Sequence, residues 1–126
     1  MTPDQIERLR QRVAAIALAL PEASEKMSHG ANAFQVAGKK MFAYFQHDHH
    51  GDGITSVTVK TSGLEEQAML IEADPDIYYR PAYIGHQGWV GLRLDQGEPD
   101  WDQVAHRLQI SWRLAAPNKL AGMVDF

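Results

Sequence analysis

Apolar residues recur at helical spacing near the start of the chain. Ile6, Leu9, Val13, Ile16 and Leu20 lie three or four residues apart, as they do on one face of a helix. The stretch Thr2-Pro3-Asp4-Gln5 combines a capping threonine, a proline suited to the first turn and a glutamine placed for a capping box, and Pro21 ends the pattern. This pattern predicts a helix between Thr2 and Pro21.

The pattern then changes to short β-like runs separated by glycines and polar loops. The expected strands cover residues 25–29, 34–36, 41–47 and 54–60, and they suggest an antiparallel meander of three or four strands. A second capping-box pattern, Ser62-Gly63-Leu64-Glu65, predicts a short helix that ends near Ala73.

In the last third of the chain, predicted strands are again followed by a predicted helix. A hairpin is expected from strands 77–83 and 89–94, with Gly85 and Gly88 framing its turn, followed by a helix that Asp100 caps and that runs to Pro117. Residues 118–126 receive no assignment and are treated as a tail that is flexible or docks on the domain. The order predicts one α+β domain over residues 1–126, two-layered, α-β(3-4)-α-β(2)-α, with helices on one face of an antiparallel sheet.

Composition narrows the function classes. The chain has 126 residues, of which 44% are hydrophobic, and it has no cysteine, so we expect no disulfide, no thiolate chemistry and a reducing, cytoplasmic location. No segment is long and apolar enough to predict membrane insertion. The net charge of −4 argues against a general polyanion binder, although a local basic patch stays open.

The strand GWVGLRL raises the question of a functional surface. Its alternation places Val90, Leu92 and Leu94 on a core face, and Trp89, Gly91 and Arg93 on the opposite face. If the neighbouring strands alternate in the same phase, Lys60 lies on this opposite face too. Counting every second residue adds Tyr78 and Arg80 from one strand, and Lys40, Phe42 and Tyr44 from another. Gly91 would leave a shallow recess beside the indole, where a planar group could approach the backbone.

The outer surface would then carry aromatic rings among cations, a composition suited to single-stranded nucleic acid or to a protein interface. The candidate binding residues are Lys39, Lys40, Lys60, Arg80, Trp89 and Arg93. The alternative is structural: the C-terminal tail, through Met123, Val124 and Phe126, covers Trp89, and Arg93 only lies across it.

Histidines concentrate in the loop HDHHGDG, residues 47–53. His47, His49 and His50 are the metal-ligand candidates, but the composition is that of a hairpin tip with surface histidines, so no metal and no other cofactor is assigned. His29 and His86 lie beside glycines near strand ends, where each could act as an acid or base or could hydrogen-bond a turn. No catalytic residue is assigned.

Four segments together resemble a known family. LPEASEKMSHG, FQVAGKKMFAYF, ADPDIYYRPAYIGHQGWVGLRL and SWRLAAPNKL are similar, in order and spacing, to the bacterial MmcQ/YjbR-like proteins. The resemblance implies a fold related to frataxin-like and secretion-chaperone-like domains and a proposed DNA-binding role for two wing-like β elements. It implies no agreed substrate, cofactor or catalytic residue. The family's recurring positions are Gly38, Lys39, Phe42, Pro81, Gly88 and Trp89.

These observations lead to three hypotheses. The first is a non-enzymatic, cytoplasmic protein that binds DNA or single-stranded nucleic acid through the outer sheet face. The second is a module for protein interaction or homodimerisation that uses the same face. The third is a small-molecule pocket between sheet and helices, which a partly polar cavity holding a histidine or carboxylate of shifted pKa would favour.

Overall fold

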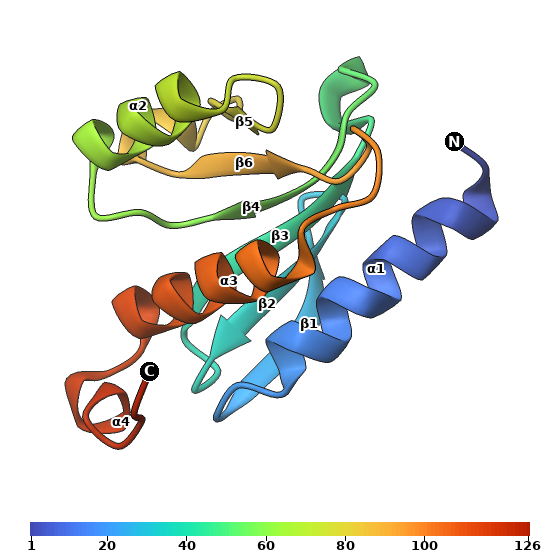
Figure 1. Ribbon diagram of the computed structural model, residues 1–126. Coiled ribbons are helices and arrows are strands. Elements are labelled where there is room, and N and C mark those ends of the chain that lie inside the picture. The colour runs from blue at the N-terminus through green and yellow to red at the C-terminus, as the bar shows by residue number, and fades with distance from the viewer.

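The computed structural model describes residues 1–126, which form six strands, four helices and two 3-10 turns (Figure 1). In chain order these are α1 (Pro3–Leu18), β1 (Ala23–Ser28), β2 (Ala31–Val36), β3 (Lys40–His47), η1 (His49–Gly51), β4 (Thr55–Val59), α2 (Leu64–Ala73), β5 (Tyr78–Tyr79), η2 (Gly85–Gln87), β6 (Val90–Arg93), α3 (Trp101–Ala115) and α4 (Asn118–Ala121). None of the helices has the length and apolar character needed to cross a membrane.

All six strands belong to one antiparallel sheet, in the order β1-β2-β3-β4-β6-β5. Helices α1 and α3 pack side by side against one face of this sheet, and α2 lies beside its β5–β6 end (Figure 1). We call the face under α1 and α3 the inner face and the opposite one the outer face. The predicted α+β class, element order and one-sided helix layer are confirmed.

Two of the three predicted helix caps form as expected. Thr2 accepts a hydrogen bond from Gln5 N at 3.2 Å and its own amide donates to Gln5 Oε1, which completes the capping box of α1. Asp100 caps α3 through Gln103 N. At α2 the N-cap is Gly63, which has no capping side chain, and only the return bond from Ser62 N to Glu66 Oε1 is present.

The hydrophobic core lies between the inner face and the helices. Val57, Val59, Val90 and Leu92 face it, as the alternating pattern predicted, and they are at most 2% exposed. Helix α3 is also hydrogen-bonded to the sheet, because Ser111 Oγ accepts from Lys60 N and donates to Phe42 O. The bond from Lys60 N to Ser111 lies directly after Val59, the last residue of β4, so the strand ends where its backbone turns to α3.

Simple parity along β3 gives a wrong prediction for Phe42. Phe34 pairs with Ala43 while the next residue, Gln35, pairs with Met41, so Phe42 is an extra residue opposite this step. Such a β-bulge changes the alternation of side chains along the strand. Phe42 therefore belongs to the buried core and does not join Tyr44 on the outer face.

The strand expected over residues 77–83 is much shorter than predicted. β5 comprises only Tyr78 and Tyr79, which pair with Leu92 and Gly91. Pro81 has no amide hydrogen, so it cannot continue the ladder. Counting every second residue placed Tyr78 on the outer face together with Arg80, but Tyr78 points into the core. Tyr79 lies on the outer face instead, against Gly91.

The C-terminal tail docks at the far end of α3. The rings of Trp112 and Phe126 lie 5.6 Å apart in an edge contact, and Arg113 Nη1 donates to Phe126 O. The alternative in which this tail covers Trp89 is therefore wrong.

Candidate functional site

The outer face is partly covered by the chain's own aromatic side chains. Trp89 lies there as predicted, yet it is only 5% exposed. Its ring packs against Tyr44, with centroids 5.4 Å apart, and the Lys60 ammonium lies 6.0 Å from its centroid. Gln67 of α2 donates to the Trp89 carbonyl at 2.6 Å. The expectation of an indole presented to solvent is wrong, because Trp89 forms part of a packed layer.

The recess expected at Gly91 is also filled. A Cβ built on Gly91 would lie 2.2 Å from Cε1 of Tyr79, so the Tyr79 ring rests directly on the glycine backbone. The Tyr79 hydroxyl is hydrogen-bonded to Ser56 Oγ at 2.6 Å. Gly91 therefore provides the space that the structure uses to lay Tyr79 flat on the sheet.

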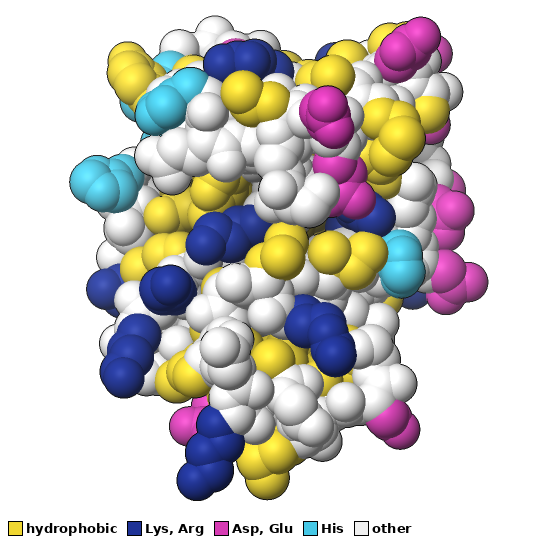
Figure 2. Space-filling view, turned by 90° about the vertical axis from the view of Figure 1, so that its left-hand side faces the viewer, with side chains coloured by type: hydrophobic (Ala, Val, Ile, Leu, Met, Phe, Trp, Pro, Cys, Tyr) yellow, Lys and Arg dark blue, Asp and Glu magenta, His cyan; other side chains and the backbone are white.

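The predicted cationic residues differ in their availability. Arg93 is half-buried and its guanidinium donates to Asp95, with Nε 2.8 Å from Oδ1. Lys60 is half-buried over Trp89, whereas Lys39, Lys40 and Arg80 are exposed. Figure 2 shows lysine and arginine side chains spread among hydrophobic surface, with most acidic side chains toward the right-hand edge.

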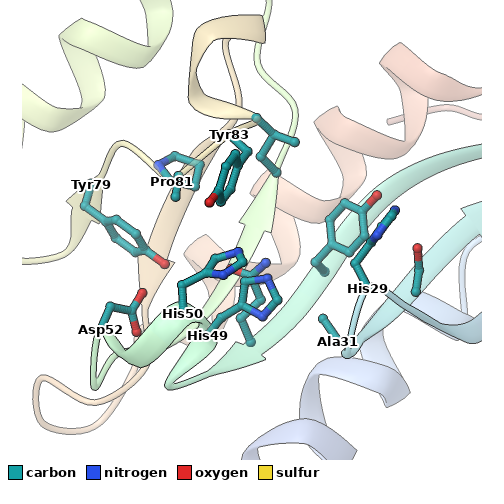
Figure 3. A pocket seen from close by; sticks show the side chains of 13 residues that line it. His29, Ala31, His49, His50, Asp52, Tyr79, Pro81 and Tyr83 are labelled. Carbon is teal, nitrogen blue, oxygen red and sulfur yellow. The ribbon is translucent and has the colours of Figure 1, made fainter.

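A cavity of about 350 Å³ lies on the outer face (Figure 3). Four stretches of chain enclose it: the β1–β2 turn, the outer side of β2 and β3, the loop at η1, and the segment from β5 toward η2. The lining residues are Ser28, His29, Ala31, Tyr44, Gln46, His49, His50, Asp52, Tyr79, Pro81, Ala82, Tyr83 and Ile84. We call this space the outer cavity.

Imidazoles and phenols face one another across the outer cavity. His50 and Tyr83 point toward each other, with ring centroids 4.9 Å apart, and His49 lies against His50 at 4.0 Å (Figure 3). Burial, together with the neighbouring His50, lowers the pKa of His49 below its ordinary value of 6.5. His49 is therefore held mainly as a neutral imidazole at neutral pH.

Three of the lining residues have left-handed backbone although none is glycine. The φ angles are +53° at His29, +58° at His50 and +65° at Tyr83. This conformation costs an L-residue roughly 1 to 2 kcal/mol, and such residues concentrate at functional sites. Glycine would relieve the strain but would remove the ring from the cavity wall.

The structure divides the histidine loop rather than gathering it into a metal site. His47 Nδ1 bonds Thr55 Oγ1 at 2.7 Å, while His49 and His50 turn into the outer cavity after Asp48, whose own φ is +50°. No three histidine, aspartate or glutamate side chains come close enough together to hold a metal ion.

Sequence reasoning placed Tyr44 on the outer face but missed Tyr79 and Tyr83, which also line the cavity. It noted His29, His49 and His50 separately and did not connect them to Tyr44, Tyr79 and Tyr83. The one available signal was Tyr83 itself, an aromatic residue in the proline- and glycine-bounded stretch from Pro81 to Gly85, where a loop over the sheet would place it.

The fold is therefore an α+β domain with one antiparallel sheet, helices against its inner face and the outer cavity on the opposite face. The family model YjbR matches residues 18–114, and the chain belongs to the YjbR family. The resemblance predicted from the four sequence segments is thus confirmed.

Among solved structures, the chain is similar to Deinococcus radiodurans protein DR2400, described as a DUF419 family-model domain. The TM-score is 0.66 and the identity 20%, over 85% of this chain and 78% of that one. At this identity the likeness supports the fold alone. No curated protein matches the sequence.

Proposed function

We propose that this protein is a small-molecule-binding protein whose site is the outer cavity. The observation that carries the proposal is a cavity of about 350 Å³ whose lining includes three non-glycine residues held in left-handed backbone conformation. The volume falls within the ~300 to 1,000 Å³ range of small-molecule sites. This is the third of the sequence hypotheses, moved from the helix side of the sheet to its outer face.

The chemistry of the lining favours a ligand with a planar aromatic part. Tyr44, Tyr79 and Tyr83 offer ring surfaces on which such a group can pack. Burial raises the pKa of both Tyr44 and Tyr79, so their hydroxyls stay protonated at neutral pH and can donate hydrogen bonds. Gln46 and Asp52 add acceptors at the wall.

The arrangement supports binding rather than catalysis. A catalytic imidazole is normally oriented by a second group, most often a carboxylate. None of His29, His49 and His50 is hydrogen-bonded to a carboxylate in the structure, and Asp52 instead accepts from the amide of Ile54 at 2.9 Å.

The nucleic-acid and subunit-contact hypotheses both rely on an exposed Trp89 beside free cations. With Trp89 buried and Arg93 bonded to Asp95, the outer face keeps exposed cations but loses its predicted stacking platform. The net charge of −4 adds no general attraction for phosphates. We therefore place the small-molecule site ahead of both.

A ligand-observed NMR screen of aromatic fragments tests the proposal. Hits are measured again with Ala82→Trp, which places a large side chain at an exposed position of the cavity wall. The control is Ala68→Trp, the same change at an exposed position of α2 outside the cavity. We expect hits that bind wild type and Ala68→Trp and that lose at least tenfold in affinity for Ala82→Trp.

Two results would contradict the proposal. One is a screen with no binder, and the other is a set of hits that bind Ala82→Trp as tightly as wild type. A parallel titration with a single-stranded decanucleotide at low salt separates the nucleic-acid hypothesis. Binding that is lost in a Lys39→Gln, Lys40→Gln variant and kept in Ala82→Trp would replace our proposal with that hypothesis.

A further inference from the structure

Lys60, which lies over Trp89, and the neighbouring Lys40 have no acidic partner, and neither lines the outer cavity itself. Neither Lys40 nor Lys60 takes part in any of the ion pairs of the structure. Burial and the nearby charge of Lys40 both lower the pKa of Lys60, so the two ammonium groups repel each other and no carboxylate offsets them. Two uncompensated cations close together, of which Lys60 is half-buried, favour an anion from solution.

Register places Lys60 within reach of a ligand in the cavity. Tyr44, a lining residue, pairs with Thr58 on β4, and Lys60 follows two residues later, directly after the end of that strand. Two residues correspond to about 7 Å along a strand. Tyr44 also touches Trp89, over which Lys60 extends, so one aromatic layer connects the cavity to the ammonium group.

Asp52 and Asp95 do not neutralise the positive charge at Lys60. Asp52 lines the cavity at η1, and Asp95 is bonded to Arg93 and to the amide of Thr55, both at the other end of β4. Tyr44 thus lies between the aromatic cavity on one side and the unpaired positive charge of Lys60 on the other.

We infer that the ligand of the outer cavity is an aromatic anion, whose ring lies in the cavity and whose carboxylate or phosphate is held by Lys60 with help from Lys40. This inference rests on the proposed function and specifies its ligand class. It makes Lys60 the residue that sets the preference for charge, and it leaves the aromatic walls to bind the ring.

Matched pairs of ligands test the inference. Phenylacetate and phenylacetamide, indole-3-acetate and its amide, and adenosine monophosphate and adenosine differ mainly in the anionic group. Their affinities are measured by calorimetry at low salt for wild type, Lys60→Met and Lys119→Met. Methionine keeps an apolar stem over Trp89, and the backbone bond from Lys60 N to Ser111 does not involve the side chain. Lys119, exposed on the remote helix α4, is the control.

We expect the anionic member of at least one pair to bind about tenfold more tightly than its neutral partner, the size of a charge-assisted hydrogen bond. In Lys60→Met the two should agree within about twofold, with the neutral ligand unaffected, and Lys119→Met should behave as wild type. Equal affinities in wild type would overturn this inference and leave the proposed function intact. A charge preference that survives in Lys60→Met would also overturn it. If no member of any pair binds, the inference fails, and the fragment screen decides the proposed function separately.

Discussion

Single residues of the outer cavity combine strained backbone with aromatic side chains. His50 and Tyr83 come from loops on opposite sides of the space, both in left-handed conformation, and their rings meet in an edge contact. Loops carry such residues when the surrounding fold holds them in place. The side-chain functions proposed here therefore depend on the sheet that positions the two loops.

The pH dependence of stability should reveal the half-buried imidazole of His49. Because the folded-state pKa of His49 is lowered, its contribution is fully present above its ordinary value of 6.5, and it is lost as the pH falls from there toward the lowered value. We expect His49→Gln to lose less stability than wild type between pH 7.5 and pH 5, measured by urea denaturation.

His106→Gln, at an exposed position on α3, is the matched control and should keep the wild-type pH dependence. A His49→Gln protein whose stability falls with pH as steeply as the wild type would show that this imidazole is not shielded as described.

At the scale of elements, β5 and β6 form the floor on which the cavity wall rests. The Tyr79 ring lies on Gly91, and its hydroxyl bonds Ser56 of β4. We expect Gly91→Ala to destabilise the protein by roughly 1 to 3 kcal/mol, because the added methyl must displace a ring that is held on both sides. Fragments that bind wild type should also bind this variant more weakly, since Tyr79 lines the cavity.

Gly122→Ala provides the comparison, because a Cβ there meets only Asn118 O at 3.4 Å and Lys119 O at 3.7 Å, and its backbone is right-handed. Urea denaturation of both variants measures the difference. Equal stabilities would contradict the close packing of Tyr79 on the sheet.

The elements were largely predictable because their signals are local. The helical spacing, the capping residues Thr2 and Asp100, and the alternation through Val57 and Val90 each reflect neighbours in the chain. The bulge at Phe42 was not predictable, because it depends on how β2 and β3 pair.

The site was less predictable for the same reason. Parity placed Trp89 on the outer face correctly, but it cannot show what covers a side chain there, and Tyr44 with Lys60 covers it. The cavity is built from four stretches that only the tertiary fold brings together. The composition of the histidine loop indicated surface histidines at a hairpin tip, but it could not show that His50 meets Tyr83 and that His49 lies against His50 in the cavity wall.

At the scale of the whole molecule, the two faces of the sheet are covered differently. Helices α1 and α3 close the inner face over a continuous hydrophobic core, within a fold that the chain shares with the Deinococcus radiodurans structure. The outer face has no such helix layer, and its loops enclose the cavity instead (Figure 1). The structural and proposed functional roles are thus separated on opposite sides of one sheet.

The imidazole signals of the protein give the most direct test of the central claim that the outer cavity binds a small aromatic molecule. Of the six histidines, His29, His49 and His50 line the cavity, while His47, His86 and His106 lie outside it. In a carbon–proton NMR titration with a fragment hit, we predict saturable shifts confined to the first three. Shifts centred on His47, His86 or His106, or no saturable shift at any imidazole, would contradict the account.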